Sequence, residues 1–395
     1  MKNLTRREFV QTAGSFAAGS ALFDWQKRAR PNQIKSLVKD LLLYVGTYTN
    51  NNGSEGIYLY RMNLDSGKLE KLSSTPGISN PAFLAIDPTK RFLYAANESN
   101  QFLGQKGGGF TSFAIDQKTG ALTKLNEVTT PGVPCHVSVH PSGKAVLGAN
   151  YGGGNIVIYP VKKSGKLGEV SDVAQHSGKG FDPKRQDAPH AHCCILDATG
   201  KYAFAPDLGL DKVMIYKVDE DKAKLKSHGF AATKPGAGPR HFDFHPTYDY
   251  GYVICELNST LTAFSYNKSK GTLTELQTLS TLPADFQGTS YCADIHVHPS
   301  GKFLYGSNRG HNSIVIFSIE ENTGKLTLVG HESTRGNWPR NFSIDPTGQF
   351  LLVGNQNSNT IATFKIDEQT GKLTQQGDLL EIPAPVCLKF IPAFS

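Results

Sequence analysis

The chain has 395 residues, of which 38% are hydrophobic and 19% charged, as in an ordinary globular protein. Its formal net charge of +7 points toward nucleic acid, but that charge is unevenly distributed. Residues 1–40 carry eight Lys and Arg against three Asp and Glu, a net charge of +5, which leaves +2 (7 − 5) for the remainder. We therefore expect no nucleic-acid partner, because a phosphate-backbone footprint needs a larger cationic surface.

Residues 1–40 are predicted to be an export signal and linker. Thr5-Arg6-Arg7-Glu8-Phe9-Val10 matches the twin-arginine pattern [ST]-R-R-x-F-[LV], and a weakly apolar stretch follows from Ala13 to Phe23. The stretch is too short for a permanent membrane helix, and the twin-arginine route carries folded proteins. We predict a soluble protein that the twin-arginine machinery exports to the periplasm or beyond, with no stable membrane insertion and with cleavage between Ala18 and Pro31. A cytoplasmic tail with a chance Arg-Arg is the alternative.

From residue 41 onward one sequence motif recurs, G-x-x-P-x-x-h-x-h-[DH]-P-[ST]-G-[KQ]-[FY]-h-h-x-x-N, where h is a hydrophobic residue. We take the Asp or His before the turn as the anchor of each copy. Each copy reads as two short alternating strands around a turn, followed by a third strand and, after a Thr-Gly-Lys-Leu type of turn, a fourth. Such a unit at a period near fifty residues is typical of a β-propeller blade. The anchors are Asp87, His140, Asp197, His245, His298 and Asp345, with a truncated copy at Ile391.

The two chain ends are predicted to share one blade. The last copy has only its first strand, Val386 to Ile391, and three strands without a partner stand near the N-terminus, at 42–46, 56–60 and 68–72. Joining them gives an all-β, seven-bladed β-propeller over residues 41–395 with no open sheet edge. An open solenoid of β-units is the alternative, but it needs capping ends that the sequence does not show.

Two columns of residues mark the open end of each hairpin. Positions five before and eleven after the anchor are equidistant from the turn, so we expect them to face each other at one mouth of the central channel. The first column reads Ala82, Cys135, His192, Arg240, Ala293, Arg340 and Val386. The second reads Glu98, Tyr151, Leu208, Glu256, Arg309 and Gln356.

Ionisable residues break these columns in three consecutive blades. His192, Arg240, Glu256 and Arg309 stand where a purely structural ring would repeat small or apolar residues, and Arg240 is predicted to lie cross-strand from Glu256. Charged groups around a tapering channel are costly unless they are paired or used, so we predict a functional site here. The alternative is an Arg–Glu pair that only fills the channel. Arg340 is predicted to lie outside this cluster.

The same mouth is predicted to receive the longest loops, Ser99–Gly109, Ser171–Pro189 and Leu282–Cys292. Loops on one face of a rigid scaffold are where binding usually resides.

Metals and disulfides are the other chemistry to consider. A column of Asn and Asp ten residues after the anchors offers oxygen ligands for calcium, but a repeated residue is better explained as a cap of each hairpin end. The six cysteines mostly fall inside strands of different blades and show no C-x-x-C spacing, so we expect buried free thiols. The column is Asn97, Asn150, Asp207, Asn308 and Asn355.

Four segments and a loop motif carry a resemblance to a known family. They are Pro189-His-Ala-His192, Gly238-Pro-Arg-His241, Glu256-Leu-Asn258 and Ser307-Asn-Arg-Gly-His-Asn-Ser313, with Lys184-Arg-Gln186 upstream. Together they resemble the lactonase family of seven-bladed propellers, which includes 6-phosphogluconolactonases and carboxy-cis,cis-muconate cyclases. The resemblance covers residues 41–395, and by it His192, Arg240, Glu256 and Arg309 fall on the proposed active-site positions of the family. The predicted export signal does not fit the pattern of this family. A pentose-phosphate lactonase works on a cytoplasmic phosphorylated sugar, so export puts a phosphorylated substrate in doubt.

The resemblance implies hydrolysis of a sugar lactone as the leading hypothesis. Arg240 and Arg309 would stabilise the negative charge that develops on the carbonyl oxygen, and His192 would take a proton from water, with Glu256 as its partner or as the base itself.

Substrate carboxylate, hydroxyl or phosphate groups would be held by Lys184, Arg185 and His190, and no metal or organic cofactor is required. The alternatives are a carboxy-muconate type of lactonising cyclase and a non-catalytic binding propeller.

Overall fold

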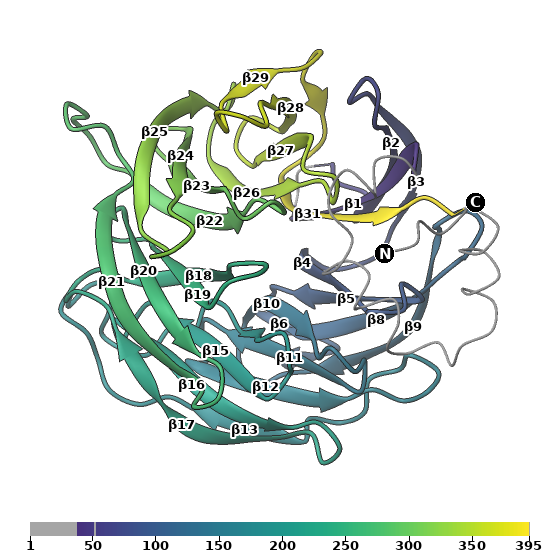
Figure 1. Cartoon of the computed structure of the whole chain (residues 1–395). Coiled ribbons are helices and arrows are strands. Elements are labelled where there is room, and N and C mark those ends of the chain that lie inside the picture. The colour runs from purple at the N-terminus through teal and green to yellow at the C-terminus, as the bar shows by residue number, and fades with distance from the viewer. Residues whose placement is uncertain (1–37, 51–52, 395) are drawn as a thin grey trace, which may run out of the picture.

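The computed structural model describes residues 38–50 and 53–394. Within these ranges the secondary structure is strand and turn, and no helix there is long and apolar enough to cross a membrane. The strands form seven sheets around a central axis, together with one small hairpin (Figure 1). The predicted all-β, seven-bladed propeller is confirmed. Residues 1–37, and with them the twin-arginine motif, lie outside the described residues.

The blades follow one another in chain order, each listed from its innermost strand outward. Blade 1 contains β4 (Pro81–Ile86), β5 (Phe92–Asn97), β8 (Gly109–Ile115) and β9 (Leu122–Thr129). Blade 2 contains β10 (Pro134–Val139), β11 (Ala145–Asn150), β12 (Asn155–Pro160) and β13 (Asp172–Gln175). Blade 3 contains β14 (Ile195–Leu196), β15 (Tyr202–Asp207), β16 (Lys212–Asp219) and β17 (Lys224–Ala232). Blade 4 contains β18 (Pro239–Phe244), β19 (Tyr250–Cys255), β20 (Thr260–Asn267) and β21 (Thr272–Ser280).

The remaining strands complete the ring. Blade 5 contains β22 (Tyr291–Val297), β23 (Phe303–Arg309), β24 (Ser313–Ile319) and β25 (Leu326–Ser333). Blade 6 contains β26 (Pro339–Ile344), β27 (Phe350–Asn355), β28 (Thr360–Ile366) and β29 (Leu373–Gln375), and β30 (Leu380–Glu381) also pairs with β28. Blade 7 contains β31 (Pro385–Pro392), β1 (Asp40–Thr47), β2 (Ile57–Asn63) and β3 (Leu69–Thr75). The loop between β5 and β8 holds the hairpin of β6 (Gln101–Phe102) and β7 (Gln105–Lys106).

Blade 7 joins the two ends of the described chain. β1 pairs antiparallel with β31, from Leu41 opposite Pro392 to Thr47 opposite Pro385. Figure 1 shows the purple β1 beside the yellow β31. The predicted closure is confirmed.

Both faces of β1 are buried, because strand alternation sends its side chains to two neighbouring blades. Leu42 and Tyr44 pack in a core cluster with Leu84 of blade 1. Leu43 packs in a different cluster with Leu352 of blade 6. Since each blade is covered on both faces by its neighbours, the ring must close to bury its core.

The histidine anchors fasten one blade to the next. The Nε2 atoms of His140 and His298 donate hydrogen bonds to the carbonyl oxygens of Gly200 and Gly348, at 3.0 and 2.8 Å. Each of these glycines lies in the turn of the following blade, and His245 repeats the contact with Gly301 at 2.9 Å. The histidine anchor is therefore an interblade contact as well as a turn signal.

The inner strands contain a β-bulge near the channel mouth. In blade 4, Pro239 pairs with Cys255 and His241 pairs with Ile254, so Arg240 is the extra residue between them. The same shift occurs in the inner pairs of five other blades. The residue five before the anchor therefore has no partner directly opposite, which corrects the predicted register of Arg240 and Glu256.

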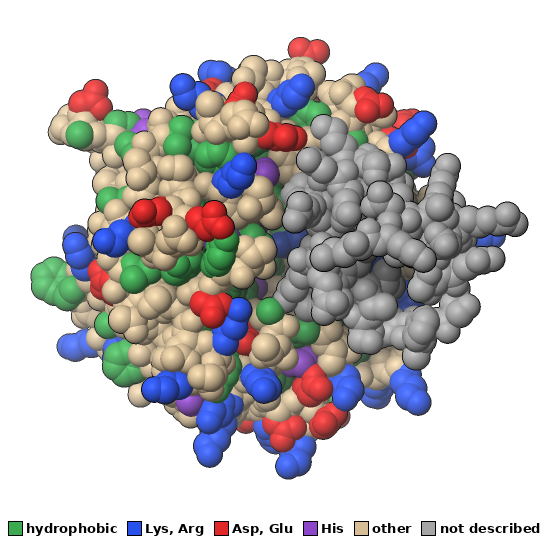
Figure 2. Space-filling view, viewed as in Figure 1, with side chains coloured by type: hydrophobic (Ala, Val, Ile, Leu, Met, Phe, Trp, Pro, Cys, Tyr) green, Lys and Arg blue, Asp and Glu red, His purple; other side chains and the backbone are tan. Residues whose placement is uncertain are grey.

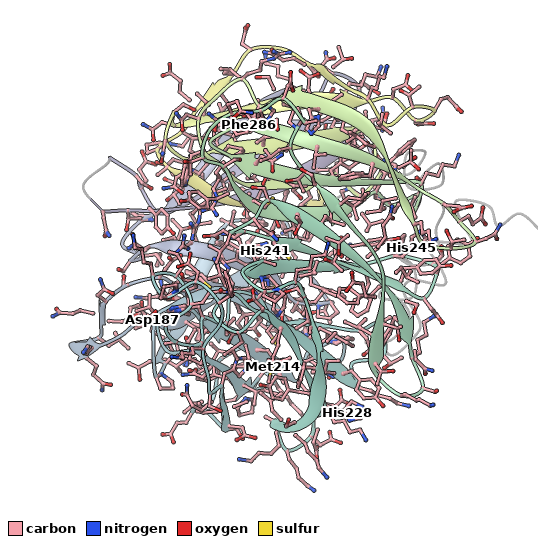
Figure 3. All side chains as sticks on the ribbon, turned by 90° about the vertical axis from the view of Figure 1, so that its left-hand side faces the viewer. Asp187, Met214, His228, His241, His245 and Phe286 are labelled. Atoms are coloured by element: carbon pink, nitrogen blue, oxygen red, sulfur yellow. The ribbon has the colours of Figure 1, made fainter. Side chains whose placement is uncertain are left out.

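Figure 3 shows how an inner strand crosses the molecule. Asp187, from the loop that follows β13, lies at one face, His241 lies in the middle, and the anchor His245 lies toward the other face. On the face seen in Figure 2, Lys and Arg side chains are interspersed with Asp and Glu wherever grey atoms do not cover the surface.

Candidate active site

A pocket of about 210 Å³ opens where the inner hairpins end. Its volume is below the range typical of drug-sized sites, so it suits a compact ligand. Seven of its eight lining residues belong to the two predicted columns, and the eighth, Arg185, comes from the loop after β13. The lining residues are Glu98, Cys135, Tyr151, Arg185, His192, Glu256, Arg309 and Arg340.

Glu256 is the centre of an arginine–glutamate cluster, by which we mean Glu256 with Arg185, Arg240 and Arg309. Arg309 Nη2 and Arg240 Nε reach Glu256 Oε2 at 2.7 and 3.1 Å. Arg185 Nη2 reaches the other oxygen, Oε1, at 2.7 Å. Burial opposes the charge of Glu256, but the guanidiniums of Arg309, Arg240 and Arg185 outweigh it and lower the pKa to about 2. Glu256 is therefore a fixed anion, and arginines already contact both of its carboxylate oxygens.

Arg240 lies behind Glu256 and does not line the pocket. Only 1% of the residue is exposed, and its Nη1 donates to Ala293 O and to His241 Nε2, the latter at 3.2 Å. Burial lowers its pKa to about 10, and Arg309 and Arg340 contribute. Arg240 and Glu256 form an ion pair at 3.1 Å, although the bulge shifts them from the directly cross-strand register that was predicted. The contact of Arg240 with the carbonyl of a substrate stays a prediction, and its place in the structure favours a supporting role.

His192 is a neutral imidazole at the pocket wall. Burial, with Arg240 as the next contribution, holds the pKa of His192 well below its ordinary value. Its Nδ1 lies 3.6 Å from Cys135 Sγ, and its ring meets Tyr151 edge-on at 5.5 Å. Among the described residues no hydrogen bond or ion pair joins His192 to Glu256, because the arginines occupy both carboxylate oxygens.

Arg340 lines the same pocket as His192, Glu256 and Arg309, which corrects the prediction that it stands apart from them. Its Nη2 lies 3.4 Å from Glu98 Oε2, which also accepts a hydrogen bond from Tyr48 Oη at 2.8 Å. Tyr48 follows β1 and supplies the seventh member of the column eleven after the anchors. The sequence analysis did not propose Glu98 or Tyr48 as site residues, although Glu98 stands in the column eleven after the anchors. Tyr48 could have been found by placing the N-terminal strand beside the last one in the shared blade.

The loop from His176 to His190 carries Arg185 into the pocket and is held at several points. Gln186 is fully buried, and its side chain donates to Leu208 O and Asp211 Oδ1 at 2.8 and 2.7 Å. His176 Nδ1 lies 2.5 Å from Asp207 Oδ2. These contacts fix the loop on both sides of Arg185, whose guanidinium reaches Glu256 Oε1.

The other two residues predicted to bind substrate lie outside the pocket lining. Lys184 is exposed on the loop. His190 stacks on Tyr151 with ring centroids 4.5 Å apart and lies 3.1 Å from Tyr151 O through its Nδ1. His190 therefore supports a lining residue, and a contact of either residue with substrate stays a prediction.

The column of Asn and Asp caps the hairpin ends, as the structural interpretation expected. Asn97 Nδ2 donates to Ser79 O at 2.7 Å, and Asn308 Nδ2 donates to Thr281 O at 2.8 Å. Within residues 38–50 and 53–394 no group of three His, Cys, Asp or Glu side chains is placed to hold a metal ion. All six cysteines are buried free thiols, as predicted.

Fold and site together define a seven-bladed β-propeller with a small pocket of arginine, glutamate and histidine at one channel mouth. The family model described as a lactonase, seven-bladed β-propeller, matches residues 42–390, and the chain belongs to this family. It is 39% identical to the 6-phosphogluconolactonase of Bacillus subtilis (strain 168) over 350 residues, which are 88% of this chain and 97% of that protein. A 6-phosphogluconolactonase of Formosa agariphila is 38% identical over 77% of this chain and 86% of its own length.

Among solved structures, the periplasmic gluconolactonase PpgL of Pseudomonas aeruginosa superposes with a TM-score of 0.84 at 33% identity. The match covers 90% of this chain and 99% of that one.

Proposed function

We propose that this protein hydrolyses a sugar lactone to the open-chain aldonic acid. The observation that carries the proposal is the arginine–glutamate cluster beside a neutral His192 in one compact pocket. Relatives named 6-phosphogluconolactonase and gluconolactonase, at 33 to 39% identity, support this class of reaction.

His192 acts as the general base in this proposal. Its unprotonated imidazole takes a proton from water as the water oxygen bonds to the carbonyl carbon. The carbonyl electron pair moves onto oxygen, where Arg309 and Arg185 stabilise the charge as fixed cations. The tetrahedral intermediate then re-forms the carbonyl and breaks the bond to the ring oxygen, which takes the proton back from His192.

The substrate must suit the charge of the site. Four arginines stand against two glutamates in and behind the pocket, an excess of two positive charges that favours an anionic lactone. The arginines are Arg185, Arg240, Arg309 and Arg340, and the glutamates are Glu98 and Glu256.

Location bears on the same question. The twin-arginine motif at residues 5–10 supports export, and the relative from Pseudomonas aeruginosa is named as periplasmic. Export would argue against a phosphorylated sugar as the substrate, and a carboxylate is the other group that could give the lactone its negative charge. Lactones that carry a phosphate and lactones that carry a carboxylate therefore need to be compared as substrates.

A panel of neutral, carboxylated and phosphorylated sugar lactones tests the proposal, with ring opening followed by acid release above the spontaneous rate. We expect the anionic lactones to have the lower KM, and His192→Gln to abolish turnover while ligand binding remains. Turnover of no lactone, or unchanged turnover in His192→Gln, would overturn it. Formation of a lactone from a muconate would identify a cyclase, and binding without turnover in the wild type would identify a binding propeller.

A further inference from the structure

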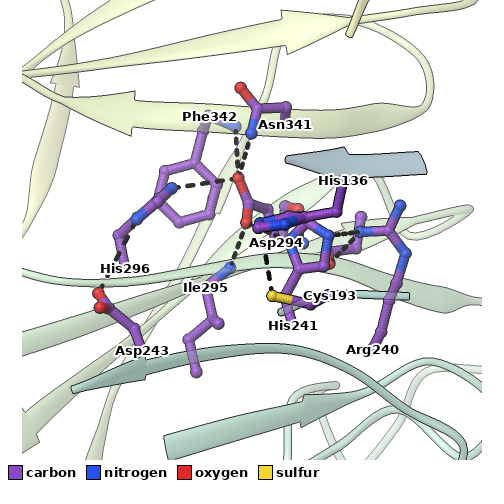
Figure 4. Close-up of polar contacts among 12 residues, drawn as sticks. His136, Cys193, Arg240, His241, Asp243, Asp294, Ile295, His296, Asn341 and Phe342 are labelled. Carbon is purple, nitrogen blue, oxygen red and sulfur yellow. Dashed lines mark hydrogen bonds and ion pairs between the residues drawn. The ribbon is translucent and has the colours of Figure 1, made fainter. Parts of the chain in front are cut away.

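Behind the pocket a second ring of side chains lines the channel, one residue further along each inner strand. These residues stand four before each anchor, and Asp294 carries the only formal charge among the seven of them. Figure 4 shows two of them, His241 and Asn341, in contact with Asp294. The ring consists of Phe83, His136, Cys193, His241, Asp294, Asn341 and Cys387.

Asp294 is an anion held inside the channel. It is 2% exposed and accepts hydrogen bonds from His241 Nδ1 at 2.7 Å, from His296 Nε2 at 3.1 Å and from Asn341 Nδ2. The backbone N–H of Ile295 donates to it at 3.0 Å. Burial opposes its charge, but His296 and His241 outweigh burial and hold the pKa of Asp294 well below its ordinary value.

That anion fixes the tautomer of His241. Because Nδ1–H donates to Asp294, a neutral His241 leaves Nε2 without a proton, as an acceptor. Arg240 Nη1, which can only donate, lies 3.2 Å from this Nε2. Burial and Arg240 lower the pKa of His241 to about 4, which agrees with a neutral ring at neutral pH. A proton on Nε2 would point at the guanidinium and break the contact.

Arg240 transmits this orientation to the pocket. Its Nε donates to Glu256 Oε2, the same oxygen that Arg309 reaches at 2.7 Å. A continuous path of polar contacts therefore runs from Asp294 through His241 and Arg240 to Glu256.

We propose that His241 and Asp294 are positioning residues that aim Arg240 and thereby set the geometry of the arginine–glutamate cluster. The inference rests on the proposed lactone hydrolysis for its kinetic test. A structural role alone would not require this arrangement, because apolar side chains of similar volume fill a channel without the cost of burying a charge. The polar chain instead ends on the group that holds the pocket arginines.

His136 provides a matched control. It stands in the same ring, is 5% exposed like His241, and lies against it with ring centroids 5.7 Å apart. Its nitrogens contact Cys193 Sγ and the backbone N–H of Cys194, and no arginine. Truncation of either imidazole leaves a similar cavity, but only truncation of His241 releases Arg240.

The test compares His241→Ala, His241→Gln and His136→Ala in the full chain. Loss of a hydrogen bond to a charged group predicts that kcat of His241→Ala falls about 10- to 100-fold, with KM changed less, since Arg240 does not line the pocket. His136→Ala should keep kcat within about twofold at a similar loss of stability. His241→Gln should recover most of kcat, because its amide oxygen can accept from Arg240 while its amide N–H₂ donates to Asp294. Equal kcat in the two Ala variants, or no recovery in His241→Gln, would overturn the proposal.

A second readout does not depend on activity. Nitrogen NMR of the histidine rings in the wild-type chain should show His241 as the Nδ1–H tautomer at neutral pH, and Arg240→Ala should leave that tautomer in place. A protonated ring or the Nε2–H tautomer would overturn the positioning role even if lactones are opened. If no lactone is opened but His241 has the expected tautomer, the proposed function alone fails.

Discussion

Replacing Glu256 with Gln removes one negative charge and nearly preserves shape. Three guanidiniums then face a neutral amide, and its N–H₂ group must stand where the carboxylate accepted a hydrogen bond. Arg240 has the least freedom to respond, because it is 1% exposed and held by His241 and Ala293. We therefore expect the substitution to lower the stability of the fold and to disturb the alignment of the pocket arginines.

The size of the loss follows from the pKa of Glu256. The structure lowers this pKa from 4.5 to about 2, and that difference corresponds to roughly 3 kcal/mol in favour of the charged form. A protonated glutamate resembles Gln, so Glu256→Gln should lower the free energy of unfolding by a similar amount at pH 7. Because a depressed carboxyl pKa stabilises above its unfolded value, the wild-type advantage should shrink as pH falls from about 4.5 to about 2.

Urea unfolding of wild type and Glu256→Gln at pH 7 and at pH 3 measures this difference, and lactone turnover is followed in parallel. Turnover should fall by about two orders of magnitude, as when a fixed charge stabiliser is lost. Glu98→Gln is the matched control, because Glu98 lines the same pocket with a single arginine at 3.4 Å, and it should cost about 1 kcal/mol or less. Equal stability losses in the two variants would refute the reasoning.

Four further predictions can be checked independently. Arg240→Ala should lower thermal stability more than Arg340→Ala, because Arg240 is the more buried and donates to three groups; equal melting shifts would contradict this. Stability should fall as pH drops from about 6.5 toward 4, because burial lowers the pKa of His136, His192, His241, His245 and His298, so the unfolded chain binds more protons. His241 alone contributes roughly 3 kcal/mol to this loss, whereas His296, whose pKa is raised, acts in the opposite direction; constant stability in denaturant titrations over this range would rule it out. Deleting residues 41–72 should abolish the cooperative melt of the whole ring, since β1 supplies the ladder to β31; an unchanged melt would show another closure. A reporter fused to residues 1–40 should be exported, and Arg6→Lys with Arg7→Lys should stop it; export that survives the double change would remove the case for the twin-arginine route.

The architecture was predictable because each blade repeats the same local signals. The anchor turn and the alternating strands gave the number of blades and the shared blade at the chain ends. The position of the pocket followed as well, since residues at one place in the repeat must meet around the axis. The pairing of Arg340 was harder to predict. The residue opposite it in its own blade is the neutral Gln356, which suggests that Arg340 stands apart from the charged residues. In the closed ring, however, it contacts Glu98 of blade 1.

The β-bulge explains the error in register and why His241 and Asp294 were not recognised beside Arg240. Simple alternation sends neighbouring residues of a strand to opposite faces, so on that rule the residues four and five before an anchor do not line the same channel. The bulge removes the residue five before the anchor from the ladder, so that Arg240 and His241 contribute to successive rings of one channel. The two columns must therefore be read together: the first supplies the buried Arg240, and the second supplies His241, which accepts a hydrogen bond from Arg240, and Asp294, which fixes the tautomer of His241. Arg240 can be buried to 1% exposure because Glu256, His241 and the carbonyl oxygen of Ala293 together accept its hydrogen bonds.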